Sequence, residues 1–135
     1  MQPNITISTV DLHRLDLLLD RLPAAQSGTR DRLADELARA AVVEPWDMPP
    51  RVVTMNSTVR FRLVDAGAEF RRTLAYPKDL GADGERVSVL SPVGSALLGL
   101  AEGDRIDWVH PDGQTIGVEV LEVVWQPERA GAFHL

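Results

Sequence analysis

The sequence predicts an α+β fold, in which a short N-terminal antiparallel helical hairpin precedes a twisted antiparallel sheet that carries one short helix. Apolar residues recur at spacings of three and four through residues 10–42, which is typical of amphipathic helices. Three prolines in residues 45–50 then interrupt this pattern. From Arg51 onward, apolar and polar residues alternate as in half-buried strands. We therefore divide the chain into a hairpin (residues 1–44), a linker (45–50) and a second domain (51–135).

The hairpin is expected from two apolar stripes of similar length. The first helix is predicted over Val10–Leu22, with Ser8 or Thr9 as its N-cap. A loop over residues 24–29 follows Pro23, and the second helix is predicted over Arg30–Val42. At 1.5 Å per residue each arm is about 20 Å long.

Two carboxylates, Asp20 and Asp31, flank the tip of this hairpin. They permit two interpretations. A pair of carboxylates brought together helps to hold a metal ion. Alternatively, Asp31 favours a helix N-terminus and Asp20 pairs with a nearby arginine.

The second domain is predicted to contain five strands and one short helix. Ser91 and Pro92 form a tight corner before the helix, and Gly99 is expected to end it. Strict alternation is lost over residues 121–125, so we expect a bulge or burial on both faces there. The aromatic residues Phe61, Trp108 and Trp125 are expected to fill the core. The expected strands are residues 59–63, Glu69–Tyr76, a strand from Val87, Ile106–Val109 with a hairpin turn at Pro111–Gly113, and a long strand from Ile116.

Composition limits the function classes. The chain is 44% hydrophobic and 25% charged, with a net charge of −6, which disfavours a nucleic-acid binder that works through a broad basic surface. No apolar run approaches the length of a membrane span, and residues 1–5 lack the features of a signal peptide. The chain has no cysteine. We expect a cytoplasmic protein with no membrane association and no sequence-specific nucleic-acid binding.

No catalytic or metal-binding constellation is apparent, so neither an enzymatic activity nor a cofactor is expected. The histidines at positions 13, 110 and 134 are scattered and have no metal-ligand spacing. Ser91 and Ser95 lie outside a nucleophile elbow. Arg60, Arg62, Arg71 and Arg72 lie on adjacent predicted strands, either as an ordinary solvated face or as a small basic patch for an acidic partner.

The segment Val87–Trp108 closely resembles the C-terminal domain of the Gre factors, bacterial proteins that act on RNA polymerase. Residues 48–61, Leu74–Pro77 and 121–131 resemble one subfamily, the regulators of nucleoside diphosphate kinase (Rnk), so the resemblance covers nearly the whole chain. It implies a fold similar to that of FK506-binding proteins for the second domain.

This resemblance also implies a partner, RNA polymerase, and docking at the rim of its secondary channel. The positions that match the docking loop are Leu90, Ser91, Pro92 and Val93. A proline-fixed corner that presents apolar atoms has little conformational entropy to lose on binding, which agrees with docking. The alternative interpretation is that Ser91 and Pro92 only cap a helix.

One departure from the Gre pattern bears on activity. Gre factors carry a long coiled coil whose acidic tip reaches the polymerase active site and promotes transcript cleavage. Here the arms are about 20 Å long, and the loop Pro23–Thr29 contains no carboxylate. We therefore expect polymerase binding without stimulation of cleavage.

The sequence is also compatible with functions other than polymerase binding. The implied fold suggests a prolyl isomerase, but such a pocket needs aromatic walls, whereas the aromatic residues here are expected in the core. An interaction module with another protein partner is a further alternative. The subfamily name implies control of nucleoside diphosphate kinase, either directly or as a consequence of altered transcription.

Overall fold

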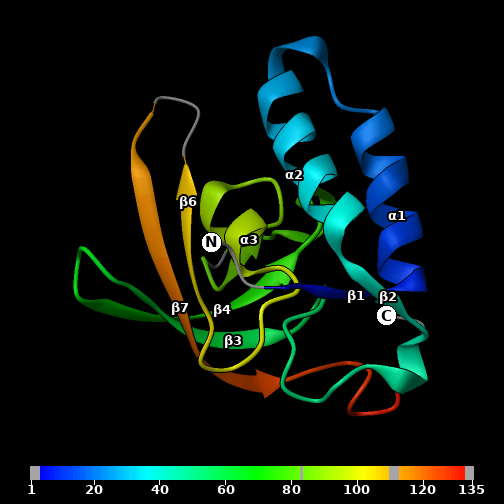
Figure 1. The fold of residues 1–135 in the computed structure, drawn as a ribbon, viewed down its shortest axis with the longest axis vertical. Coiled ribbons are helices and arrows are strands. Elements are labelled where there is room, and N and C mark those ends of the chain that lie inside the picture. The colour runs from blue at the N-terminus through cyan, green and yellow to red at the C-terminus, as the bar shows by residue number, and fades with distance from the viewer. Residues whose placement is uncertain (1–3, 83, 110–112, 133–135) are drawn as a thin grey trace.

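The computed structural model describes residues 4–82, 84–109 and 113–132, and it confirms the α+β class. Two layers are visible in Figure 1: a pair of helices lies on one side of the molecule, and a curved sheet wraps around a short helix on the other. The N-terminal elements are β1 (Thr6–Ser8), α1 (Thr9–Asp20), the 3₁₀ turn η1 (Ala24–Gln26), α2 (Ser27–Arg39), β2 (Ala41–Val43) and the 3₁₀ turn η2 (Pro45–Asp47).

The helices α1 and α2 lie side by side and are joined by a short turn (Figure 1). Ser8 caps α1, because its side-chain oxygen accepts a hydrogen bond from the Asp11 amide at 3.0 Å. The loop is shorter than expected, since α2 already begins at Ser27.

The predicted extension of the second helix to Val42 is wrong. The helix ends at Arg39, Ala40 is extended, and Ala41–Val43 pair in parallel with Thr6–Ser8. The Ala41 amide donates to the Ile5 carbonyl at 2.9 Å, and the β-branched residues that follow favour extended backbone. The N-terminal lead thus contains a strand, and Ile7 within it and Ile5 just before it are buried.

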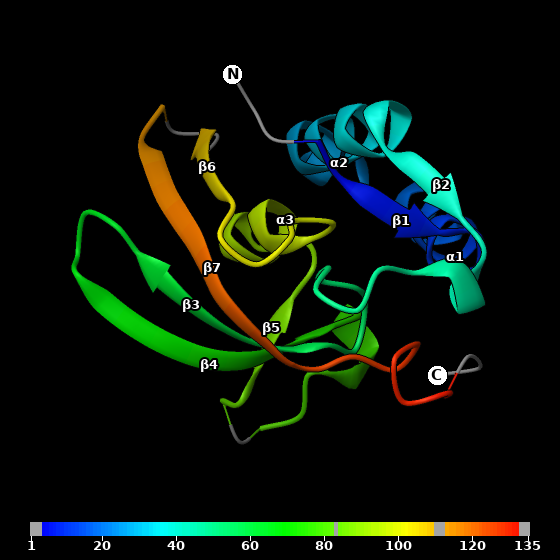
Figure 2. The same ribbon diagram turned by 60° about the horizontal axis from the view of Figure 1, so that its bottom comes forward.

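The second part of the chain contains β3 (Thr58–Leu63), β4 (Ala68–Ala75), the 3₁₀ turn η3 (Pro77–Asp79), β5 (Arg86–Ser88), α3 (Pro92–Leu97), β6 (Arg105–Val109) and β7 (Thr115–Trp125). The strands form a five-stranded sheet in the order β5-β4-β3-β7-β6. The long strand β7 lies between β3 and β6 in this sheet, and α3 packs beside it (Figure 2).

The expectation of a wholly antiparallel sheet is wrong at one pair, because β5 pairs in parallel with β4. The connection after Tyr76, which includes η3, carries the chain back so that β5 pairs with the last three residues of β4, Thr73–Ala75. The expected turn at Pro111–Gly113 lies outside the described residues, apart from Gly113 itself.

The expected irregularity in the last strand is a pair of bulges. The register of β3 against β7 shifts twice, which leaves Leu121 and Val124 as extra residues. Each bulge moves the alternation by one, so the buried positions become Val120, Val123 and Gln126. Trp125, expected in the core, is therefore 39% exposed, whereas Phe61 and Trp108 are buried as predicted.

One hydrophobic core joins the two parts of the molecule. It contains Leu15 and Leu33 from the helix pair together with Leu97 and Leu100 from the α3 region, all fully buried. Within the described ranges, no helix has the length and apolar character needed to cross a membrane.

Candidate protein-binding site

The corner between β5 and α3 is held by a dense set of local hydrogen bonds. The Ser91 hydroxyl donates to the Ser88 carbonyl at 2.7 Å and accepts from the Gly94 amide at 3.0 Å. The Ser95 hydroxyl donates to the Val89 carbonyl at 2.6 Å. Pro92 occupies the first turn of α3, where no amide hydrogen is needed. The corner is therefore rigid, and Ser91 is the helix cap that the sequence predicted.

One side of the corner faces the helix pair. Leu90 and Pro92 line a narrow crevice together with Trp108 and two residues of α2, Thr29 and Arg32. All four predicted docking residues, Leu90–Val93, are half-buried. Helix α2 and the corner thus form parts of one continuous surface.

The other side of the corner opens onto a shallow apolar depression of about 220 Å³ on the concave face of the sheet. The Phe61 and Phe70 rings stack across β3 and β4 with centroids 5.7 Å apart. The Arg72 guanidinium lies over the Phe70 ring, 5.4 Å from its centroid. The depression is lined by Phe61, Leu63, Phe70, Arg72, Arg86, Val87 and Val93.

Sequence reasoning missed this depression as a site. The alternation of β3 placed Phe61 and Leu63 on one face, but the pairing of Phe61 with Phe70 depends on the register of two strands. The approach of Val93 depends on the position of α3 over the sheet. Neither is a local property of the sequence.

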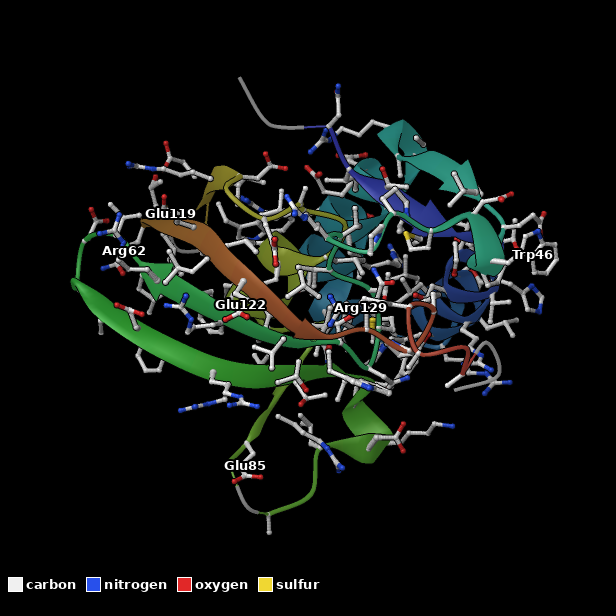
Figure 3. All side chains as sticks on the ribbon, turned by 90° about the horizontal axis from the view of Figure 1, so that it is seen from below. Trp46, Arg62, Glu85, Glu119, Glu122 and Arg129 are labelled. Atoms are coloured by element: carbon white, nitrogen blue, oxygen red, sulfur yellow. The ribbon has the colours of Figure 1, made fainter. Side chains whose placement is uncertain are left out.

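The predicted group of arginines is divided between the two faces of the sheet. Arg60 pairs with Arg71 in the β3–β4 register, as expected, and forms ion pairs with Glu69 (2.8 Å) and Glu122 (3.5 Å). Figure 3 shows Arg62 beside Glu119 on the outer face, and the two form an ion pair. Arg72 lies on the opposite, concave face with Phe70. The outer face is therefore an ion-paired solvated surface at Arg60 and Arg62, not a purely basic patch.

The tip carboxylates are both exposed. Asp20 is the last residue of α1, and Asp31 lies in the second turn of α2, 3.4 Å from the Arg30 guanidinium. Among the described residues, no group of three or more histidine and carboxylate side chains is arranged to hold a metal ion. His13 is exposed on α1, and His110 and His134 lie outside the described residues.

Buried polar contacts join the N- and C-terminal segments beneath the helices. The Thr54 hydroxyl lies 2.7 Å from the Ser57 hydroxyl and donates to Glu128 at 2.7 Å. Asp11 of α1 is buried beside this group, and burial, reinforced by the charge of Glu128, raises its pKa to about 7. A carboxyl group at the interface of helix and sheet thus titrates near neutral pH.

Comparison with known proteins matches each part of this chain to a family model. A family model described as the C-terminal domain of the transcription elongation factors GreA and GreB matches residues 48–124. A model described as the Rnk N-terminus matches residues 3–43.

Individual relatives agree with these matches. The chain is 44% identical over 134 residues to the regulator of nucleoside diphosphate kinase of Escherichia coli (strain K12), which covers 99% of this chain and 98% of the relative. It is 33% identical over 90 residues to the transcription elongation factor GreA of Helicobacter hepaticus, covering 67% of this chain and 55% of that protein.

A solved structure supports the fold. The prokaryotic transcription elongation factor GreA/GreB from Nitrosomonas europaea superposes with a TM-score of 0.72 at 52% identity. The alignment covers 92% of this chain and all of the other.

Proposed function

The chain belongs to the Rnk branch of the GreA/GreB family, and from this premise we propose that it binds RNA polymerase near the secondary channel and regulates transcription without stimulating transcript cleavage. The observation that carries the proposal is the rigid corner Leu90–Val93, which adjoins an apolar depression. We place any effect on nucleoside diphosphate kinase downstream of polymerase binding.

The corner and the depression together make a suitable docking surface. The hydrogen bonds of Ser91 fix the corner before any partner arrives, so little conformational entropy is lost on binding. Val93 belongs to both the corner and the depression, so a partner that contacts the corner also covers the apolar side chains beside it.

The absence of cleavage stimulation is proposed from the dimensions of the helix pair. The helices contain 12 and 13 residues, which corresponds to arms of about 18–20 Å. The acids nearest the tip are Asp20, at the end of α1, and Asp31, which faces Arg30. We infer that this tip neither reaches the polymerase active centre nor presents a free pair of carboxylates there.

The remaining parts of the proposal follow from the same premise. Residues 1–44 and 51–135 act as a helical unit and a docking domain joined by residues 45–50, and the docking domain shares its fold with FK506-binding proteins. RNA polymerase is the partner, so the protein works in the cytoplasm and needs no sequence-specific contact with nucleic acid.

The first test is binding of the full chain to RNA polymerase core enzyme, with and without a competing Gre factor. Micromolar binding that the Gre factor displaces is expected. The double variant Ser91→Ala/Pro92→Ala disrupts the corner, and Val87→Thr and Val93→Thr make the depression polar while retaining side-chain shape. Each is expected to weaken binding by at least about threefold, once circular dichroism has shown that it folds.

A matched control lies on the outer face of the sheet. The double variant Arg62→Gln/Glu119→Gln removes one exposed ion pair without changing the net charge, and it is expected to bind like the wild type. No binding at micromolar concentration, or equal loss in the control, overturns the docking proposal. Stimulated cleavage in a backtracked complex overturns the proposed absence of cleavage activity.

A further inference from the structure

A second depression, of about 260 Å³, lies between the outer side of α1 and the turn that follows β4. Four of its lining residues, three in α1 and the C-cap Arg21, are spaced by three or four, so they share one helix face. The other two come from the start of the η3 turn. The lining consists of Arg14, Leu17, Leu18, Arg21, Tyr76 and Lys78.

The apolar wall of this depression, formed by Leu17, Leu18 and Tyr76, includes one side chain that is exposed to solvent. Leu17 is 44% exposed, although it lies beside the half-buried Leu18 and the buried ring of Tyr76. A leucine exposed at the edge of a depression offers apolar surface to a ligand.

Positive charge surrounds this wall. Arg14, Arg21 and Lys78 are all basic, and no carboxylate lines the depression. In the part of the chain that the structure describes, neither Arg21 nor Lys78 forms an ion pair. The neighbouring acids Asp11 and Asp79 act on the Tyr76 hydroxyl but are not part of the lining. This local positive surface stands out in a chain with a net charge of −6.

We propose that this depression binds a small polyanion that carries an aromatic or apolar group, and that a nucleoside diphosphate is the chemical class that fits it. The guanidinium of Arg21 and the ammonium of Lys78 are suited to phosphate oxygens. The base packs against Leu17 and Leu18. The volume of about 260 Å³ is close to the lower end of small-ligand sites, which is roughly 300 Å³.

This proposal is independent of polymerase docking, because none of its residues belongs to the corner or its adjoining depression. The direct test is titration of the full chain by amide NMR with GDP, guanosine, inorganic pyrophosphate and polyglutamate in separate experiments. GDP is expected to bind more tightly than guanosine or pyrophosphate, with shifts confined to α1 and residues 76–79.

Single variants then measure how much each side chain contributes to GDP binding. Arg21→Gln and Lys78→Gln are each expected to weaken GDP binding by about fivefold or more through loss of a charge-assisted contact. Leu17→Gln is expected to weaken GDP binding, so that the affinity for GDP approaches the lower affinity for pyrophosphate. The matched control Arg71→Gln removes the same charge from an exposed position outside the depression and is expected to change the affinity by less than about twofold.

Three outcomes overturn the proposal. The first is no GDP binding at millimolar concentration. The second is pyrophosphate binding as tight as that of GDP, which would remove any role for the apolar wall. The third is binding of polyglutamate alone, which would assign the depression to an acidic protein segment instead.

Discussion

The carboxylate of Asp11 accepts a hydrogen bond from the backbone amide of Met55 at 3.1 Å, which ties the first turn of α1 to the segment that leads into β3. These residues are 44 positions apart, and both are buried. Burial and the charge of Glu128 raise the pKa of Asp11 to about 7, while the Met55 amide and Arg14 act in the opposite direction. The contact that joins helix and sheet is therefore made by a group that prefers to be protonated.

The contribution of Asp11 to the free energy of unfolding is expected to fall as the pH rises from about 4 to 7. In this range the unfolded carboxyl, with its ordinary pKa of 3.8, has lost its proton, whereas the folded one retains it. Above pH 7 both forms are ionised and the contribution is constant. Over this range the contribution of Asp11 lowers the free energy of unfolding by a total on the order of 4 kcal/mol. Urea unfolding of the wild type and Asp11→Asn at several pH values measures it.

Asp11→Asn retains an oxygen that can accept from Met55 but cannot ionise. Its unfolding free energy is expected to depend less on pH, and at pH 8 to exceed that of the wild type. Asp16→Asn, at an exposed position of the same helix, serves as the control and should follow the wild-type profile. Equal pH dependence of Asp11→Asn and the wild type would contradict the assignment.

Gly94 is expected to tolerate no side chain. A Cβ atom there would lie 2.7 Å from the carbonyl carbon of Ser88 and closer still to its oxygen, both rigid backbone atoms. Gly94→Ala must push α3 away from the corner, and we expect a loss of about 3 kcal/mol in the free energy of unfolding. Urea unfolding at fixed pH checks this value, and a loss below about 1 kcal/mol would show that the corner yields.

Gly28 provides the opposite case. It lies in the first turn of α2 without a positive φ, and apart from its chain neighbours and the backbone of its own helix no atom lies within 4 Å of the position that the methyl group of an alanine would occupy. Gly28→Ala is expected to stabilise the protein by about 0.5–1 kcal/mol, because alanine loses less backbone entropy in a helix. A destabilised variant in the same urea assay would be inconsistent with α2 beginning at Ser27.

The features that sequence predicted well are those set by neighbouring residues. Ser91, Pro92 and Gly99 predicted the beginning and the end of α3, because capping and left-handed backbone are local properties, and Gly99 indeed has a φ of +81°. Loss of alternation after Val120 predicted a bulge or burial on both faces, and the structure shows two bulges there.

The features that sequence missed depend on contacts between distant segments. The pairing of β1 with β2 joins residues 35 positions apart, so the apolar residues near Val42 looked like the end of a helix. A carboxylate such as Asp11 in the first turn of a helix is ordinarily a favourable charge at the surface, so the local sequence does not indicate that it is buried. Its burial depends on the placement of Glu128 and Met55 in the folded chain. The exposure of Trp125 follows from the number of bulges, which alternation alone does not count.

Gln126 is a further residue whose role only the structure shows. It is fully buried, and its side-chain amide donates to the carbonyls of Pro49 (2.9 Å) and Val52 (2.7 Å) while its oxygen accepts from the Arg129 amide (3.0 Å). Gln126→Leu removes these three hydrogen bonds and leaves the buried Val52 carbonyl without its side-chain donor, so we expect a loss of about 3 kcal/mol in the free energy of unfolding. Urea unfolding measures it, with Gln26→Leu as an exposed control that is expected to change stability by less than about 0.5 kcal/mol. Equal stability of the two variants would refute the role of Gln126 in holding the linker.

Ser91 allows the cap and the docking surface to be separated. Ser91→Ala removes the acceptor for the Gly94 amide and the donor to Ser88, and we expect it to lower the unfolding free energy by about 1 kcal/mol. Ser91→Thr retains both groups and is expected to stay within about 0.5 kcal/mol of the wild type. If the cap holds the docking geometry, polymerase affinity falls in the alanine variant and is retained in the threonine variant. Equal polymerase affinity for all three proteins, each shown to be folded, would mean that Ser91 serves the helix alone and that docking does not depend on its cap.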